Sequence, residues 1–205
     1  GEYMKGVVQG EKNILFVNMA WGLGVGIIID GNLYYGKSGF SGEFGHFCMF
    51  ENEVLCHCGK KGCLETEASG SAFHRILMER HREGSNTILA QKLDSGEDIS
   101  LGDLLEAIRK EDVLCIDILE KMGVNLGKGI AGLMNIFNPE LVILGGTLSL
   151  AGEYISLPIK SAIRKYSLNL VNQDTEIKIS KLGERAGAFG ACLLSRSKLL
   201  GIIHY

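Results

Sequence analysis

The first 35 residues constrain the fold most, because they hold three short apolar runs joined by a turn signal. Residues 13–19 and 23–29 are rich in apolar and β-branched side chains, and Asp30-Gly31 directly follows the second run. An Asp-Gly pair between two such runs is a strong signal for a tight antiparallel hairpin. We therefore expect strands at 13–19, 23–29 and 33–35, in a sheet that begins with antiparallel pairs.

The remainder of the chain alternates helical patterns with two further short apolar runs. The run at 139–146 ends in two glycines and is typical of a buried parallel strand that enters a glycine turn, and 176–180 is expected as another strand. We expect helices at 67–79, 86–94, 101–110, 113–137, 153–166 and 186–199, with Asn86 and Ser100 as N-caps. This order, with no repeat and no linker, predicts one α/β lobe.

Several glycines lie inside two of these helices. Gly123, Gly127, Gly129 and Gly132 are expected on one side of helix 113–137, where they would allow a neighbouring helix to approach closely. The small residues of helix 186–199 are interpreted in the same way. Neither set of small residues indicates a ligand site.

Composition excludes some classes of function. The 205 residues are 46% hydrophobic and 22% charged, as in an ordinary globular protein, and the net charge of −3 gives no reason to expect nucleic-acid or membrane binding by this chain itself. The only basic stretches are weak ones at 75–82 and 159–165. No signal peptide and no apolar run of about 18 residues is present, so the expected location is the cytosol.

Three cysteines and one histidine form the strongest chemical signal. Cys56, Cys58 and Cys63 follow the pattern C-x-C-x4-C, and His46 precedes them by ten residues. Three thiolates and one imidazole make a closed tetrahedral set, which is typical of structural zinc. Gly59 and Gly62 stand where a tight chain reversal inside such a knuckle needs glycine.

Other interpretations of the cysteines remain open. Buried free thiols are common, whereas disulfides are disfavoured by the cytosolic setting and by the short spacing of Cys56 and Cys58. Cys48, Cys115 and Cys192 lie in apolar contexts and are expected in the core, although Cys48 is near enough to remain a rival ligand.

Two carboxylates flank the knuckle. Glu43 and His46 lie in a glycine-rich loop, and Glu65 comes just after Cys63. A metal that folds residues 46–63 into a rigid clip would bring Glu65 near Glu43. Carboxylates and a histidine that converge in this way suit recognition of a hydroxyl-rich ligand such as a sugar, and zinc on one ring nitrogen would orient the other toward it.

Three motifs carry a family resemblance: Gly-Glu-Phe-Gly-His at 42–46, Cys-His-Cys-Gly-Lys-Lys-Gly-Cys-Leu-Glu at 56–65, and Asn-Pro-Glu-Leu-Val-Ile-Leu-Gly-Gly at 138–146. Together they resemble the ROK family of repressors, open reading frames and sugar kinases, and within it the transcriptional regulators of the NagC and XylR type. The resemblance covers nearly the whole chain. It implies that residues 1–205 are a single lobe, the C-terminal lobe of an actin-like, hexokinase-type ATPase (ribonuclease H-like) fold, with a zinc knuckle inserted at about 42–66.

The resemblance also implies roles for individual residues. It assigns zinc binding to His46, Cys56, Cys58 and Cys63, and contacts with sugar hydroxyls to Glu43, His46 and Glu65. It places a second phosphate-binding turn at Ala20-Trp21-Gly22-Leu23-Gly24, and an adenosine-side turn at Gly145-Gly146. Structural zinc is the implied cofactor, and ATP with Mg²⁺ is implied only for a kinase.

Two departures from the family pattern bear on activity. The opening Gly1-Glu2-Tyr3-Met4-Lys5-Gly6 resembles the segment that follows the family's Asn-Asp catalytic loop, so we expect the catalytic aspartate, the first phosphate turn and the N-terminal lobe to lie outside this chain. Phosphoryl transfer needs groups positioned from both sides of a cleft, and we therefore expect no catalytic residue here. In addition, Ala20-Trp21-Gly22 replaces the Gly-Thr-Gly of the kinases, so a phosphate-binding hydroxyl gives way to a bulky indole.

These observations favour the sugar-sensing, zinc-containing C-terminal portion of a ROK-family transcriptional repressor. Its partners would be a sugar or sugar phosphate, DNA through a winged helix-turn-helix domain outside this chain, and further copies of itself; no membrane partner is expected. The alternative is the C-terminal half of an ATP-dependent, glucokinase-like hexose or amino-sugar kinase. A purely structural zinc module is a third interpretation.

Overall fold

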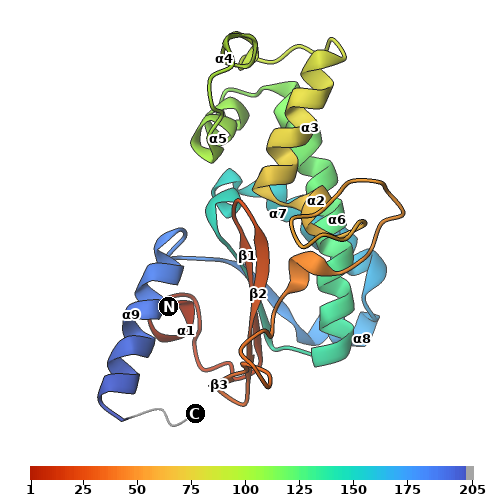
Figure 1. Ribbon diagram of the computed structural model, residues 1–205. Coiled ribbons are helices and arrows are strands. Elements are labelled where there is room, and N and C mark those ends of the chain that lie inside the picture. Colours follow the sequence, from red (N-terminus) through yellow and green to blue (C-terminus); the bar gives the residue numbers. More distant parts are fainter. Residues whose placement is uncertain (202–205) are drawn as a thin grey trace.

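The computed structural model describes residues 1–201, which form a five-stranded mixed sheet with helices on both faces (Figure 1). The strand order is β3-β2-β1-β4-β5. The strands are β1 (Ile14–Met19), β2 (Leu23–Ile29), β3 (Asn32–Leu33), β4 (Leu141–Gly145) and β5 (Glu176–Ile179). β1 pairs antiparallel with β2 and parallel with β4, while β5 extends the parallel half.

The predicted hairpin is confirmed at the Asp-Gly turn. Asp30 and Gly31 both have positive φ, at 51° and 80°, as the favoured two-residue hairpin turn requires. β3 is shorter than expected, since it ends at Leu33.

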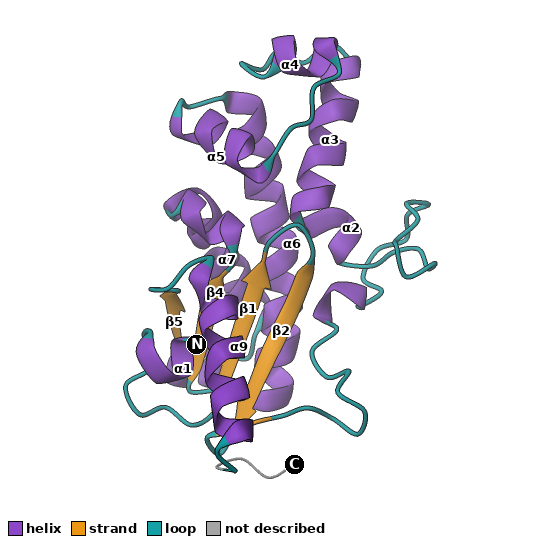
Figure 2. Cartoon of the chain, turned by 60° about the vertical axis from the view of Figure 1, so that its left-hand side comes forward, coloured by secondary structure: helices purple, strands orange, loops and turns teal. Residues whose placement is uncertain are grey.

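Successive side chains of β1 point to opposite faces of the sheet. Leu15, Val17 and Met19 are buried in the main core, which also contains side chains of α6 (Val113–Phe137). The opposite face carries Ile14 and the partly buried Phe16, on the side of α1 (Glu2–Lys5) and α9 (Arg185–Leu199) (Figure 2). The predicted α/β class is therefore confirmed.

The helices differ from expectation at several boundaries. The other elements are α2 (Glu65–Ala68), α3 (Gly70–Arg82), α4 (Ala90–Ser95), α5 (Leu101–Arg109), α7 (Glu153–Tyr166), α8 (Asn169–Asp174), and the 3-10 turns η1 (Phe44–His46) and η2 (Thr147–Ala151). The expected helix 67–79 is divided because Ser69 is extended and caps α3 by accepting a bond from Ala72 N.

The prediction that Asn86 caps a helix was wrong, because α4 begins only at Ala90. The preceding Thr87 and Ile88 instead donate hydrogen bonds to Asp112. Ser100 does cap its helix, through a capping box with Asp103.

The α6 glycines do not share one role. Added Cβ atoms at Gly123 and Gly127 would lie 2.8 Å from Pro158 Cβ and 2.6 Å from Ala162 Cβ, so these two glycines allow α7 to approach closely. Gly129 instead lies against Phe44, and a Cβ on Gly132 would meet nothing within 4 Å. The expectation that all four serve one helix contact was therefore wrong.

The prediction for the non-motif cysteines was right only in part. Cys115 is buried in the main core, but Cys48 and Cys192 are exposed. Cys48 lies in the knuckle rather than under the sheet, and Cys192 lies on α9, whose residues are mostly exposed.

Within residues 1–201, none of the helices combines the length and the apolar character that crossing a bilayer requires.

Candidate functional site

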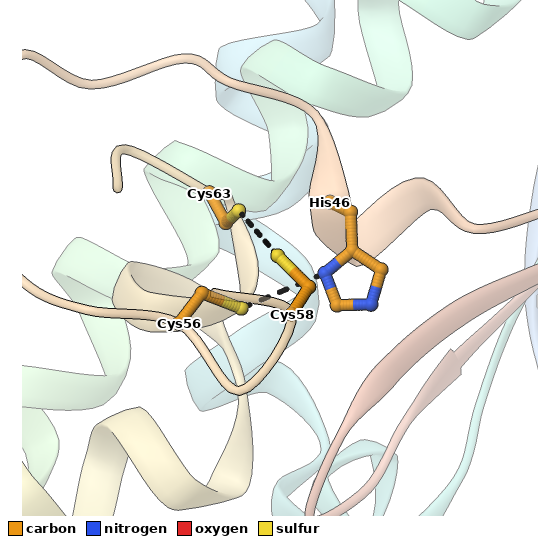
Figure 3. A group of neighbouring side chains, drawn as sticks. All are labelled: His46, Cys56, Cys58 and Cys63. Carbon is orange, nitrogen blue, oxygen red and sulfur yellow. Dashed lines mark hydrogen bonds between the residues drawn. The ribbon is translucent and has the colours of Figure 1, made fainter. Parts of the chain in front are cut away.

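The knuckle brings the four predicted metal ligands together. His46 ends η1, Cys56 and Cys58 lie in the following loop, and Cys63 stands just before α2 (Figure 3). Their ligand atoms all lie within 4.8 Å of one another. Gly59 and Gly62 have φ of 82° and 76°, so the tight reversal does use glycine where the sequence predicted.

The spacing of these atoms fits a tetrahedral metal ion. Cys58 Sγ lies 3.6 Å from Cys63 Sγ, and Cys56 Sγ lies 3.6 Å from His46 Nδ1. Around a tetrahedral zinc ion with Zn–S bonds of about 2.3 Å, neighbouring sulfurs lie about 3.8 Å apart. The donor set and the distances therefore suit a metal of the zinc type.

Burial changes the proton affinity of the Cys63 thiol. Burial, together with hydrogen bonds to Cys58 and Cys56, raises the pKa of the Cys63 thiol to about 12. The protein alone therefore holds this sulfur as a neutral thiol. A divalent cation beside it would favour the thiolate, because a coordinating thiol gives up its proton to bind the metal.

His46 connects the metal cluster to a carboxylate. Its Nδ1 faces Cys56 Sγ, while its Nε2 lies 3.6 Å from Glu43 Oε2. Glu43 is well exposed, with 61% of its side-chain surface open to solvent. The ring thus has one nitrogen directed at the Cys56 thiol and the other at the exposed carboxylate of Glu43.

Glu65 links the knuckle to the sheet. Its Oε2 accepts a hydrogen bond of 3.0 Å from Leu23 N at the start of β2. The same oxygen lies 3.1 Å and 3.0 Å from the positions where Cβ atoms on Gly22 and Gly45 would stand. Glu65 therefore lies between the β1–β2 turn and Gly45, in the loop that carries Glu43 and His46.

The two glycine turns meet at one edge of the sheet. β1 and β4 are parallel neighbours, with Asn18 opposite Gly145, so the turn at Ala20–Gly22 and the turn at Gly145–Gly146 follow the same ends of adjacent strands. A Cβ on Gly146 would lie 2.5 Å from the carbonyl oxygen of Met19, just before the first turn. Ligands of open α/β sheets bind outside the carboxyl ends of the strands.

The indole of Trp21 packs toward α3. Its ring centroid lies 5.9 Å from that of His74, at an interplanar angle of 48°, and half of its surface is exposed. The carbonyls of Ala20 and Trp21 accept bonds from Gly70 N and Ser71 N, at 2.8 Å and 3.0 Å. The N-terminus of α3 therefore holds the turn in place.

Sequence reasoning missed one pocket beside Glu65. It has a volume of about 200 Å³ and lies between the knuckle and the first turn of α3, with Cys56, Glu65 and Arg75 in its wall. Arg75 donates to the carbonyl of Thr66 and pairs with Glu79, at 2.8 Å in each case. The charge of Arg75, one of the basic residues noted at 75–82, is therefore balanced by Glu79. The only sequence signal for this ion pair is the spacing of four residues between Arg75 and Glu79, which places them one helical turn apart.

Comparisons with known proteins give one family. Residues 1–198 match the sequence profile described as "ROK family". The glucokinase of Halalkalibacterium halodurans is 36% identical over 191 residues, which are 93% of this chain and 58% of that protein.

Solved structures of two kinds resemble the chain. A ROK family glucokinase from Streptomyces griseus, in complex with glucose and AMPPNP, has a TM-score of 0.84 and 31% identity, over 96% of this chain and 64% of that one. A ROK family transcriptional regulator, a homologue of the Escherichia coli MLC protein, has a TM-score of 0.80 and 35% identity, over 87% of this chain and 44% of that one. The chain thus spans 44% to 64% of the length of these relatives, which include kinases and a regulator at similar identity.

Proposed function

The chain belongs to the ROK family, and from this premise we propose that it is the sugar-sensing, zinc-containing C-terminal lobe of a transcriptional repressor. The observation that carries the choice of repressor is Trp21. The family resemblance implies that the kinases usually have Gly-Thr-Gly in this turn. Here an indole lies against His74 instead and supplies no hydroxyl to a phosphate.

Zinc in this proposal has a structural role. His46, Cys56, Cys58 and Cys63 would hold it as a closed four-ligand set, which leaves no position for a reacting molecule. Bound zinc would supply rigidity and hold the three sulfurs as thiolates. The sugar itself would be recognised by side chains around the knuckle.

The sugar would bind at the edge where the knuckle meets β1 and β2. Glu43 and Glu65 would accept hydrogen bonds from hydroxyl groups, and Nε2 of His46 would make a third contact. The hydrogen bond from Leu23 N holds Oε2 of Glu65 at this edge, which orients the side chain before the ligand arrives. Multiple carboxylate acceptors suit a polyhydroxylated ligand, either a free sugar or a sugar phosphate.

Nucleotide binding would be weak or lost. The residues proposed for it lie at the two adjacent turns and at the strand ends beside them; they are Ala20, Trp21, Gly22, Gly24, Gly145 and Gly146. DNA binding is proposed for a region outside this lobe, and self-association and a cytosolic location are proposed for the whole protein.

The likeness to glucokinases favours a second candidate, an ATP-dependent hexose or amino-sugar kinase. Glu43, His46 and Glu65 would then position the sugar, and the base that deprotonates its hydroxyl would come from outside this chain.

One experiment on the intact protein separates the two candidates. Sugar-dependent formation of ADP from ATP is measured with glucose, xylose and N-acetylglucosamine, and release of the protein from its own upstream DNA is measured with the same sugars. We expect release from DNA and no turnover. ADP formation would contradict a function restricted to repression. A Trp21→Thr variant tests whether the indole weakens nucleotide binding, since this variant should bind ATP more tightly than the natural protein.

A further inference from the structure

Cys48 lies outside the four-ligand cluster but directly opposite one of its members. The short ladder of the knuckle pairs Cys48 with Cys63 in antiparallel register. The backbone bonds lie on either side of this pair, from Met49 N to the Gly62 carbonyl and from Leu64 N to the Phe47 carbonyl, both 2.8 Å. Cys48 and Cys63 therefore occupy a non-hydrogen-bonded position of the ladder.

This position brings two side chains close together. At a non-hydrogen-bonded antiparallel pair the Cα atoms are about 4.5 Å apart, and both side chains lie on the same face. Disulfides span Cα separations of about 4.4 to 6.8 Å. Cys48 and Cys63 can therefore be joined within the existing backbone.

The thiol of Cys48 already lies over the strand that carries Cys63. Its Sγ is 3.7 Å from the carbonyl oxygen of Lys61, and it is 3.2 Å from the position that a Cβ on Gly62 would occupy. Cys48 is exposed, whereas Cys63 is 1% exposed. A small oxidant can thus reach Cys48 from solvent, while its buried partner Cys63 stands opposite it in the ladder.

We propose that Cys48 and Cys63 form a redox modification site, at which hydrogen peroxide converts the pair to a disulfide and removes one metal ligand from the knuckle. The part of this inference that concerns the metal rests on the proposed zinc site. The disulfide itself rests only on the register of the ladder.

The chemistry proceeds in two steps. The Cys48 sulfur attacks peroxide, an S–O bond forms, the O–O bond breaks, and hydroxide leaves, so that Cys48 becomes a sulfenic acid. The Cys63 sulfur then attacks the Cys48 sulfur, the S–S bond forms, the S–O bond breaks, and a second hydroxide leaves. Overall two thiols lose two electrons and two protons, and peroxide is reduced to two waters.

Loss of Cys63 opens the cluster. The ligands that remain would be His46, Cys56 and Cys58, and a three-ligand site holds zinc less tightly than a closed one. The competing disulfide within the cluster joins Cys58 and Cys63, whose sulfurs are 3.6 Å apart. Both of those sulfurs would be bound to zinc, while Cys48 would be an uncoordinated and exposed thiol.

The test uses the full chain loaded with zinc. Zinc content is measured first, and release to a metallochromic indicator is then followed after addition of hydrogen peroxide. Free thiols are blocked, and the protein is digested without reductant by trypsin and a glutamate-specific protease. Cleavage after Glu43, Glu51, Lys61 and Glu65 separates the three cysteine regions, since Cys48 falls in peptide 44–51 and Cys63 in peptide 62–65.

We expect a disulfide between peptides 44–51 and 62–65, reversed by dithiothreitol. Cys48→Ser should retain zinc but release it about tenfold more slowly under peroxide, because it lacks the accessible thiol. Cys192→Ser, which alters another exposed cysteine on α9, should behave as the natural chain. A disulfide from Cys58 to Cys63, or equal release by Cys48→Ser, would overturn the proposal. A chain that binds no zinc but forms the 48–63 disulfide would instead overturn the proposed zinc site.

Discussion

Gly127 and Gly132 lie on one helix, five residues apart, and alanine at the two positions should change stability in opposite directions. A Cβ on Gly127 would lie 2.6 Å from Ala162 Cβ and 2.6 Å from the carbonyl oxygen of Ile159, both on α7. A Cβ on Gly132 would meet nothing within 4 Å. The two substitutions are chemically identical and differ only in what faces them.

The magnitudes follow from two opposing terms. Alanine in place of glycine inside a helix is favourable by about 1 kcal/mol. Overpacking costs about 1–3 kcal/mol, and the upper end applies to Gly127 because a backbone carbonyl cannot move aside by changing rotamer. Gly127→Ala should therefore lower the free energy of unfolding by about 1–2 kcal/mol, or Tm by about 2–8 °C for a chain of this size, and Gly132→Ala should raise Tm by about 2–4 °C.

Thermal unfolding followed by circular dichroism measures both variants against the natural chain. A urea titration of the same three proteins checks that the differences are differences in free energy. If Gly127→Ala were as stabilising as Gly132→Ala, α6 and α7 would not be in close backbone contact, and the packing described for them would be incorrect.

Three further predictions concern the knuckle and one helix cap. Cys58→Ser should lose zinc and increase hydrogen exchange over residues 46–65, and an unchanged loop would contradict a structural role for the metal. Glu65→Gln should weaken sugar binding about tenfold in calorimetry, because a charge-assisted bond becomes neutral, while zinc content stays near one per chain; equal loss of both would mean that the two roles are not separate. Ser100→Ala should cost about 1 kcal/mol at pH 6 in urea titrations, because it removes a capping box. Bonds from Lys92 and Ser100 hold the pKa of Asp103 at about 2, below its usual 3.8, so the part of this stabilisation that comes from the ionised Asp103 is present above pH 3.8 and is lost as the pH falls through 2. The bond from Asp103 N to Ser100 Oγ remains, so the effect of Ser100→Ala should shrink at pH 2, and an undiminished effect there would contradict the assignment.

Features encoded by neighbouring residues were predictable from the sequence. The Asp30-Gly31 hairpin, the C-x-C-x4-C knuckle and the 25-residue helix α6 depend on turn chemistry, ligand spacing and periodicity, all of which act within a short segment. That Glu43, His46 and Glu65 share one site was available only as an implication of the family resemblance.

Features that depend on distant contacts were not predictable. The bond between Glu65 and Leu23 joins residues 42 positions apart, and no local pattern indicates it. The division between α2 and α3 at Ser69 follows from the turn that holds Ala20 against Gly70, which overrides a continuous helical pattern. Similarly, Asn86 is a good cap by residue type, but the segment after it is held by Asp112 instead.

The position of β1 in the sheet has a consequence for how the protein is made. Its antiparallel partner β2 follows at once, but its parallel partner β4 arrives much later, since Asn13 and Glu140 at the start of the two strands are 127 residues apart. At a synthesis rate of about 5–20 residues per second, one edge of an apolar strand waits about 6–25 s on the ribosome for its neighbour. During that interval the nascent hairpin offers an unpaired edge to other chains, which identifies β1 as the segment from which aggregation during expression should begin.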